Sequence, residues 1–176
     1  GYDNAVAPLG TALTEDQLKD LWRVVREPVM CFDGDEAGQR AAFRAAERAL
    51  PIMQAGQALR FAILPAGEDP DSLVRSQGRK AFEDVLAGAL PLSEMIWREV
   101  THGRMPNTPE DRADVQQKLD QRARDISDAT FRRHFSDYFS RKLWGERGRQ
   151  SQGRGGSGGF TPRKGFGKVK LEGAVM

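Results

Sequence analysis

The sequence predicts an α/β fold, with a mainly parallel sheet and flanking helices, followed by an α-helical subdomain and a disordered tail. Three observations support this prediction. Apolar runs of strand length alternate with helical patterns up to residue 64, an order typical of parallel sheets with right-handed crossovers. Two longer amphipathic segments follow, separated by Ser127 and Asp128. From Gly145 onward the chain is rich in glycine and basic residues and poor in apolar ones, which predicts disorder.

The elements of the α/β part follow from apolar spacing and helix caps. Strands are predicted over 4–9, 28–32 and 59–64, and helices over 14–25 and 36–50. Thr14 and Gln17 match a capping box. The apolar residues after them recur at helical spacing. The second helix contains many alanines, which permit close packing on a sheet.

The remainder of the chain is predicted to be helical. Shorter helices are predicted over 71–77, 79–86 and 92–100, with a loop over 104–109. The next two segments carry apolar stripes, formed by Val115, Leu119, Ala123 and Ile126 and by Phe131, Phe135, Tyr138 and Phe139. Because only two residues separate these segments, we expect an antiparallel helical pair.

The length and composition restrict which classes of protein this chain can belong to. At 176 residues, the chain holds one domain of ordinary size, with or without a small appendage. The net charge is +2, yet the segment from Gly145 onward carries seven basic and two acidic residues. Cys31 is the only cysteine, so an internal disulfide and a cysteine-based zinc site are excluded. A thiol in an apolar strand is typical of a cytoplasmic protein, and no run is long enough to cross a membrane.

The most informative motif is Asp33-Gly34-Asp35, placed between a predicted strand and a predicted helix. Residues two apart in an extended chain point to the same side, so both carboxylates can face one point. Ligands of open α/β sheets bind at this end of the strands, and carboxylates suit Mg²⁺. The alternative is an ordinary Asp-Gly turn. A hairpin turn would lead into a second strand, whereas here a helical pattern follows.

A second acidic motif, Gly67-Glu68-Asp69-Pro70-Asp71-Ser72, follows the strand predicted over 59–64. The alternative interpretation is helix capping by Asp69 or Asp71. If the two strands are adjacent and parallel, up to four carboxylates come together. Each pair at ~4 Å repels by about 4 kcal/mol at an effective dielectric constant of ~20. A bound divalent cation removes that repulsion, so the two motifs together predict a metal site.

The sequence supports other catalytic or ligand-binding sites less well than the acidic motifs. His102 and His134 have no companion at metal-ligand spacing and are expected to be surface residues. Tyr138 lies on an apolar stripe and is expected in the core. No nucleophile triad is suggested, and no glycine-rich phosphate loop follows a strand. The tail therefore indicates a flexible linker, or weak contact with nucleic acid through its basic residues.

These motifs resemble the Toprim region of bacterial DNA primases. The resemblance is carried by 29–38, by 59–61 and by Leu64 to Val74, with further similarity at 6–12 and 89–92. It implies templated synthesis of RNA primers, in which a ribonucleotide 3′-hydroxyl attacks an α-phosphate and pyrophosphate leaves. It also implies catalytic Mg²⁺, replaceable by Mn²⁺, with Asp33 and Asp35 as catalytic metal ligands and Asp69 and Asp71 as further carboxylates. The implied partners are a single-stranded DNA template, ribonucleoside triphosphates and the replicative helicase.

The resemblance also implies that parts of a primase are missing. The catalytic glutamate of that family lies in a Glu-Gly-Tyr motif, and the spacing after Gly1-Tyr2 leaves no room for the helix that follows it. We therefore expect a fragment that is inactive alone. The zinc-binding module and the helicase-binding domain are expected elsewhere in the full protein. The expected domains are 1–88, the C-terminal part of Toprim, then the helical subdomain 89–144 and the linker 145–176.

Several alternatives stay open at this point. Topoisomerases and nucleases of the overcoming-lysogenization type also contain Toprim folds, but a topoisomerase needs a tyrosine nucleophile, and Tyr2 and Tyr138 are poorly placed for that role. Phosphatases of the haloacid dehalogenase type use an Asp-x-Asp motif, but Ala37 stands where threonine or valine is expected. A non-catalytic module that docks nucleic acid or protein partners is the alternative from a different class.

Overall fold

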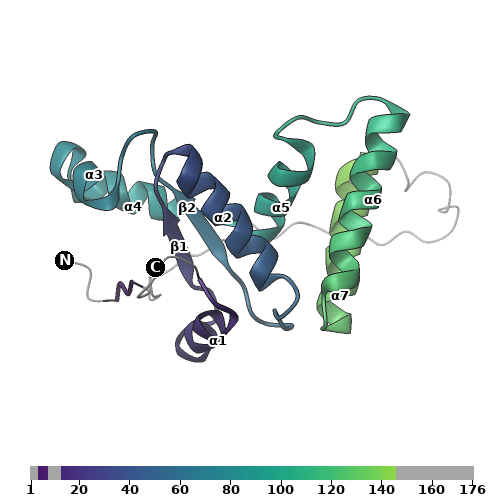
Figure 1. Cartoon of the computed structure of the whole chain (residues 1–176), viewed down its shortest axis with the longest axis horizontal. Coiled ribbons are helices and arrows are strands. Elements are labelled where there is room, and N and C mark those ends of the chain that lie inside the picture. Colours follow the sequence, from purple (N-terminus) through teal and green to yellow (C-terminus); the bar gives the residue numbers. More distant parts are fainter. Residues whose placement is uncertain (1–3, 8–12, 146–176) are drawn as a thin grey trace, which may run out of the picture.

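A computed structural model describes residues 4–7 and 13–145 (Figure 1). The helices are α1 (Glu15–Val24), α2 (Glu36–Ala49), α3 (Pro70–Gln77), α4 (Arg79–Ala87), α5 (Leu92–Thr101), α6 (Pro109–Asp125) and α7 (Ala129–Trp144). The strands are β1 (Val29–Phe32), β2 (Arg60–Ile63) and β3 (Leu90–Pro91). Within these residues, no helix combines the length and apolar character that a membrane span requires.

The three strands form one sheet in the order β1-β2-β3. β1 and β2 are parallel, with Val29 opposite Arg60 and Phe32 opposite Ile63. β2 and β3 are antiparallel. Because β1 and β2 run in the same direction in this register, both end at one edge of the sheet. This confirms the predicted adjacency of the two strands that precede the acidic motifs.

The short strand β3 was not predicted, and the segment 4–9, predicted as a strand, forms no strand over its described residues 4–7. Ala5 forms a single β-bridge, while residues 8–12 lie outside the described residues. So do 1–3 and the predicted tail from residue 146. β3 forms because tertiary contacts hold it beside β2. The guanidinium of Arg60 donates to the carbonyl oxygen of Ala89 at 2.6 Å, and Leu92 N donates to Leu59 O at 3.0 Å.

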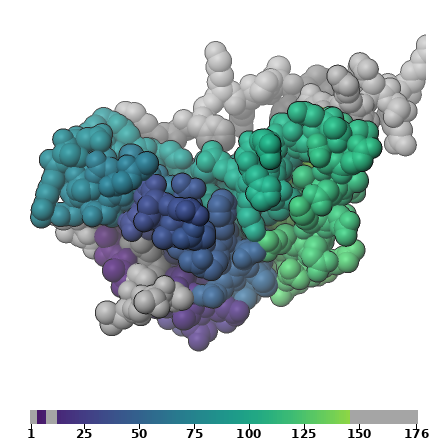
Figure 2. Space-filling view, turned by 45° about the horizontal axis from the view of Figure 1, so that its top comes forward, coloured from purple at the N-terminus to yellow at the C-terminus, as the bar shows by residue number. Residues whose placement is uncertain are grey.

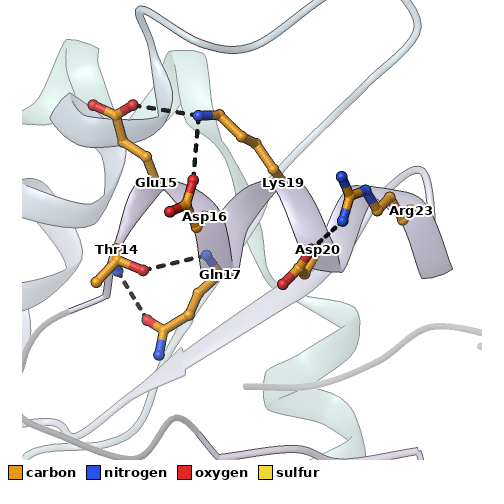
Figure 3. Close-up of polar contacts among 7 residues, drawn as sticks. All are labelled: Thr14, Glu15, Asp16, Gln17, Lys19, Asp20 and Arg23. Carbon is orange, nitrogen blue, oxygen red and sulfur yellow. Dashed lines mark hydrogen bonds and ion pairs between the residues drawn. The ribbon is translucent and has the colours of Figure 1, made fainter.

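Helix α1 begins with the predicted capping box (Figure 3). Gln17 N donates to Thr14 Oγ1 at 3.2 Å, and Thr14 N donates to Gln17 Oε1 at 2.9 Å. The exposed side of the helix carries ion pairs of Lys19 and Arg23, which contribute little to stability. On the buried side, Trp22 Nε1 donates to Ala58 O at 2.8 Å. This bond fixes α1 beside the start of β2.

Helices cover both faces of the sheet because alternate strand residues point in opposite directions. On one face, Met30 and Phe61 pack with the alanines of α2 and with α5. On the other face, Ala62 and Leu64 pack with apolar side chains of α3 and α4. Figure 1 shows α2 crossing in front of the strands and α3 and α4 apart from it. The predicted α/β arrangement is confirmed.

The predicted helical pair is also confirmed. α6 and α7 pack together after a short connection. Trp97 of α5 stacks on Phe139 of α7, with ring centroids 6.0 Å apart. Phe139, Leu18 of α1 and Phe61 of β2 belong to one apolar core. That core crosses the expected domain boundary after residue 88 without a break, and the domain limits stay a prediction.

Candidate metal site at the carboxyl edge of the sheet

Asp33 and Asp35 lie in the three-residue loop between β1 and α2, and both are exposed. Asp35 is the N-cap of α2, where its Oδ1 accepts a hydrogen bond from Gly38 N at 2.6 Å. This bond leaves the second carboxylate oxygen of Asp35 available. The Asp33 side chain forms no hydrogen bond or ion pair with the residues that the structure describes. The two carboxylates therefore differ. The start of α2 orients Asp35, whereas no contact of this kind with the described residues orients Asp33.

Two glycines allow the backbone to close tightly around Asp33. A Cβ atom at Gly34 would overlap the carbonyl oxygen of Pro65, in the loop that follows β2. A Cβ atom at Gly38 would overlap the carbonyl oxygen of Asp33 itself. Gly34 N donates to Glu68 O at 3.3 Å. The loop between β1 and α2 is thus in direct backbone contact with the loop that carries the second acidic motif.

The second acidic motif begins helix α3. Asp69 is the N-cap, with Ser72 N donating to Asp69 Oδ1 at 2.7 Å and Asp69 N donating to Ser72 Oγ at 2.9 Å. Ser72 also donates to the Glu68 carboxylate. Asp71 forms an exposed ion pair with Arg75 at 3.0 Å. Asp69 therefore caps helix α3, which was the alternative interpretation of this motif. Its Oδ2 accepts no hydrogen bond from the residues that the structure describes.

The donor set fits a loosely held magnesium ion better than an enclosed one. Within the described residues, no three histidine, cysteine, aspartate or glutamate side chains gather closely enough to hold a metal. Mg²⁺ usually keeps several waters and is bound through one or two carboxylates plus substrate phosphates. Asp33 and Asp35 can supply such a pair. The assignment of Asp33, Asp35, Asp69 and Asp71 as ligands stays a prediction.

Cys31, the thiol beside the acidic loops, is not a candidate nucleophile. Cys31 packs on the α3 and α4 side, and burial, followed by the nearby charge of Asp33, raises its pKa to about 11. The thiol is therefore protonated at neutral pH. His102 and His134 are exposed, as expected. Tyr138 packs against the core and donates from its hydroxyl to Glu94.

Sequence reasoning missed two features of this edge. One is the backbone of Glu68, whose carbonyl oxygen joins the two acidic loops. The other is a groove beside the edge, formed by α2, the end of β2 and α5. The four-residue spacing of Arg98 and His102 places both on one side of α5, but nothing local in the sequence shows which helix that side faces.

Comparison with known proteins gives consistent matches. Residues 1–60 match the Toprim domain family. The chain is 46% identical to Escherichia coli K12 DNA primase over 113 residues, which are 64% of this chain and 19% of that protein. It is 35% identical to Rickettsia felis DNA primase over 144 residues, 82% of this chain and 24% of that protein.

Solved structures of bacterial primases match the fold of this chain as well. A DNA primase domain from Pseudomonas aeruginosa matches with a TM-score of 0.69 and 39% identity, over 75% of this chain and 41% of that one. The E. coli primase catalytic core matches with a TM-score of 0.68 and 38% identity, over 77% and 44%. The chain spans about a quarter or less of the length of the curated relatives it matches. Over most of its described length it is homologous to the catalytic core of bacterial DNA primases, and the predicted Toprim fold is confirmed.

Proposed function

We propose that this chain forms part of a DNA primase and contributes the magnesium-binding edge at which RNA primers are extended on single-stranded DNA. One observation carries the proposal: two acidic loops, each following a parallel strand, are in backbone contact at Gly34 and Glu68. Similarity to the primase catalytic core over 77% of the chain supports it. A further structure, 37% identical to this chain, is a primase catalytic domain bound to single-stranded DNA.

In this proposal, Asp33 and Asp35 hold Mg²⁺, with Asp69 and Asp71 as additional carboxylates and Mn²⁺ as a substitute. When bound, the ion neutralises charge on the phosphates that react. The chain's own contribution is orientation. The cap on α2 fixes one oxygen of Asp35. The close packing of Gly34 against the Pro65 carbonyl group holds the backbone beside Asp33 against the loop after β2. The N-termini of α2 and α3 add positive potential at this edge, which favours the substrate phosphates and partly offsets the attraction of the carboxylates for the cation.

The substrates follow from the similarity to the primase catalytic core. A primer 3′-hydroxyl attacks the α-phosphate of a ribonucleoside triphosphate, a new phosphodiester bond forms, and pyrophosphate leaves with the broken bond. No protein side chain forms a covalent intermediate in this reaction, which agrees with the protonated Cys31. The template is single-stranded DNA. Docking on the replicative helicase is assigned to a separate C-terminal domain of the full-length protein.

Primer synthesis by the full-length protein tests the proposal. Asp33→Asn and Asp35→Asn remove a charge each, and asparagine is as good an N-cap as aspartate, so stability is retained. We expect each variant to lose at least about 100-fold in rate, because a catalytic metal supplies several kcal/mol. Asp20→Asn, an exposed aspartate on α1, is the matched control and should keep full activity. An Asp33→Asn enzyme with unchanged activity would rule out the assignment.

A further inference from the structure

A groove of about 1010 Å³ lies between α2, the end of β2 and α5. In Figure 2, α2 in dark blue lies beside the blue-green and green surface that contains α5 and the helical pair. Phe43 of α2 and Ile63 of β2 line the groove and are only half-buried, so they leave apolar surface open to solvent. The volume is at the upper end of that of ligand sites and gives room for a short peptide segment.

Two carboxylates in the lining keep an oxygen that accepts no hydrogen bond from the described residues. The hydrogen bonds that Glu94 accepts both go to its Oε1, so Oε2 stays available. Glu99 pairs with Arg122 through Oε1 at 2.8 Å, and its Oε2 is buried without a partner in the described part of the chain. Arg98 is the only lysine or arginine among the described residues that line the groove. The groove therefore combines apolar surface with unused anionic acceptors.

The last described helix ends against this groove. Lys142, in the last turn of α7, donates to Glu94, and its Nζ lies 4.9 Å from the centre of the Trp97 ring. Glu94 and Trp97 both line the groove. Gly145, the last described residue, follows three positions later. The rest of the chain, 146–176, is therefore attached close to the groove wall.

The sequence after α7 contains one short stretch that suits such a groove. Phe160 and Phe166 are its only aromatic residues, and Arg163 and Lys164 lie between them. Pro162 fixes one backbone dihedral angle, which reduces the entropy that the stretch loses on binding. Two apolar anchors with cations between them match the apolar walls and the available carboxylate oxygens of the groove.

Charge and length also favour this contact. The segment from Gly145 onward has seven basic and two acidic residues, a net charge of +5, which leaves −3 for residues 1–144 in a chain of net charge +2. Residues 146–159 separate Phe160 from the described chain and span at most about 50 Å when extended. A tether of this kind gives an effective concentration of about 1 mM. An intrinsic affinity of only ~0.1 mM would then fill the groove about 90% of the time.

We propose that residues 160–166 bind in this groove of their own chain, with the two phenylalanines on its apolar walls and the cations next to Glu94. The groove reaches the carboxyl edge of the sheet, because Ile63 is the last residue of β2. The bound segment covers the approach to the acidic loops from this side. This contact goes beyond the proposed function and does not rest on it, since no metal ion or substrate takes part.

Paramagnetic NMR of the isotope-labelled 176-residue chain tests the proposal. A nitroxide is attached at Ser157→Cys, three residues before Phe160. Burial, followed by the charge of Asp33, raises the pKa of the natural thiol of Cys31 to about 11, so that thiol reacts slowly at neutral pH. The same treatment of the chain without Ser157→Cys measures any label on Cys31.

The amide signals of Gln39, Phe43 and Ile63 should lose intensity at least three-fold more than those of Arg75 and Glu83. The last two residues belong to α3 and α4, which pack on the other face of the sheet. Groove signals that lose no more intensity than those of α3 and α4 would overturn the proposal.

A double substitution, Phe160→Ser with Phe166→Ser, should reduce the loss at the groove to the level of α3 and α4. Gln150→Ser with Gln152→Ser is the matched control, because it changes two polar residues of the same segment, and it should keep the full effect. Unchanged amide positions in the rest of the chain show that neither variant alters the fold. A loss at the groove that persists without the phenylalanines would overturn the proposal.

A mixed sample distinguishes the chain's own segment from that of a second copy. In it, the nitroxide is on a chain without isotope label, and the isotope-labelled chain carries no nitroxide. We expect no loss of groove signals in this mixture. A loss as large as in the singly labelled chain would show that the groove binds a second copy, which would overturn binding within one chain.

Discussion

Gly34 is the residue on which the geometry of the acidic edge most depends. It is buried where the loop after β1 meets the loop after β2. Any side chain there would occupy the space of the Pro65 carbonyl group. Its role is therefore close approach, and through that approach it sets where Asp33 and Asp35 stand relative to Asp69.

Gly34→Ala should destabilise the protein by at least about 3 kcal/mol, the upper end of the usual cost of overpacking. Urea unfolding measures the change. Gly88→Ala is the control, because a Cβ there would meet Asp84 O at 3.4 Å and Val85 O at 3.6 Å, which are ordinary contacts. Equal stabilities for the two variants would show that the loops are not in contact.

Glu99 is a second residue whose environment can be tested, through its pKa. Burial raises its pKa; the charge of Arg122 opposes that effect, and the charge of Glu47 adds to it. Arg122 pairs with both carboxylates, while Glu99 Oε2 is buried without a hydrogen-bond partner in the described part of the chain. His102 also faces Glu99 and favours its charged form.

A raised pKa in the folded state means that folding binds protons. The contribution of Glu99 to stability is therefore full at low pH and falls as pH rises through its unfolded and then its folded pKa. Glu99→Gln removes this dependence. The stability of the variant relative to the natural protein should therefore increase as the pH is raised from 4 to 7. Urea unfolding at each pH measures this difference. A difference that does not vary with pH would contradict the raised pKa.

At the scale of the element, short-range chemistry determines where several helices begin. α1, α2, α3, α6 and α7 each begin at a threonine or aspartate whose side chain accepts from the backbone three residues on. Such caps contribute about 1 kcal/mol each. Because cap and helix lie together in the sequence, these starts were predictable.

Thr14→Ala should cost about 1 kcal/mol of stability, because it removes the capping box of α1. Thermal unfolding of the chain is the measurement. Asp20→Ala on the same helix removes only an exposed ion pair and should change stability by less than about 0.5 kcal/mol. The cap would be unimportant if the two substitutions had the same effect.

Elements that depend on tertiary contacts were harder to predict. β3 has two residues and one is a proline, so its pattern resembles a loop until Arg60 and Leu59 hold it beside β2. The acidic loops were predictable because each motif lies between a strand and the helix that follows it. Their contact through Gly34 and Glu68 was not, since it depends on the register of β1 against β2. The groove escaped prediction because its walls are far apart in the sequence.

At the scale of the whole molecule, one apolar core joins the sheet to the helical pair. It runs from Leu18 of α1 through Phe61 of β2 to Phe139 of α7. Phe139 is 2% exposed and stacks on Trp97. The position of α5 beside the acidic edge, and so the groove, depends on this packing. The described part of the chain should therefore unfold as one cooperative unit.

Phe139→Ala should destabilise the protein by about 3–5 kcal/mol. Because the core is continuous, amide hydrogen exchange should speed up in β1 and α2 as much as in α6 and α7. Accelerated exchange confined to α6 and α7 would show two units that unfold separately. Trp144→Ala is the control, since this aromatic residue of α7 is 48% exposed, and it should change exchange little.

The central claim is that the two acidic loops bind a divalent cation together. Titration of the isotope-labelled chain with Mn²⁺, followed by NMR, tests it directly, because the paramagnetic ion broadens nearby amide signals even when binding is weak. We expect the amide signals of Gly34, Gly38, Asp71, Ser72 and residues 67–69 to broaden first, excess Mg²⁺ to restore them, and Asp33→Asn to abolish the effect. Broadening that begins elsewhere, or that persists in Asp33→Asn, would contradict it.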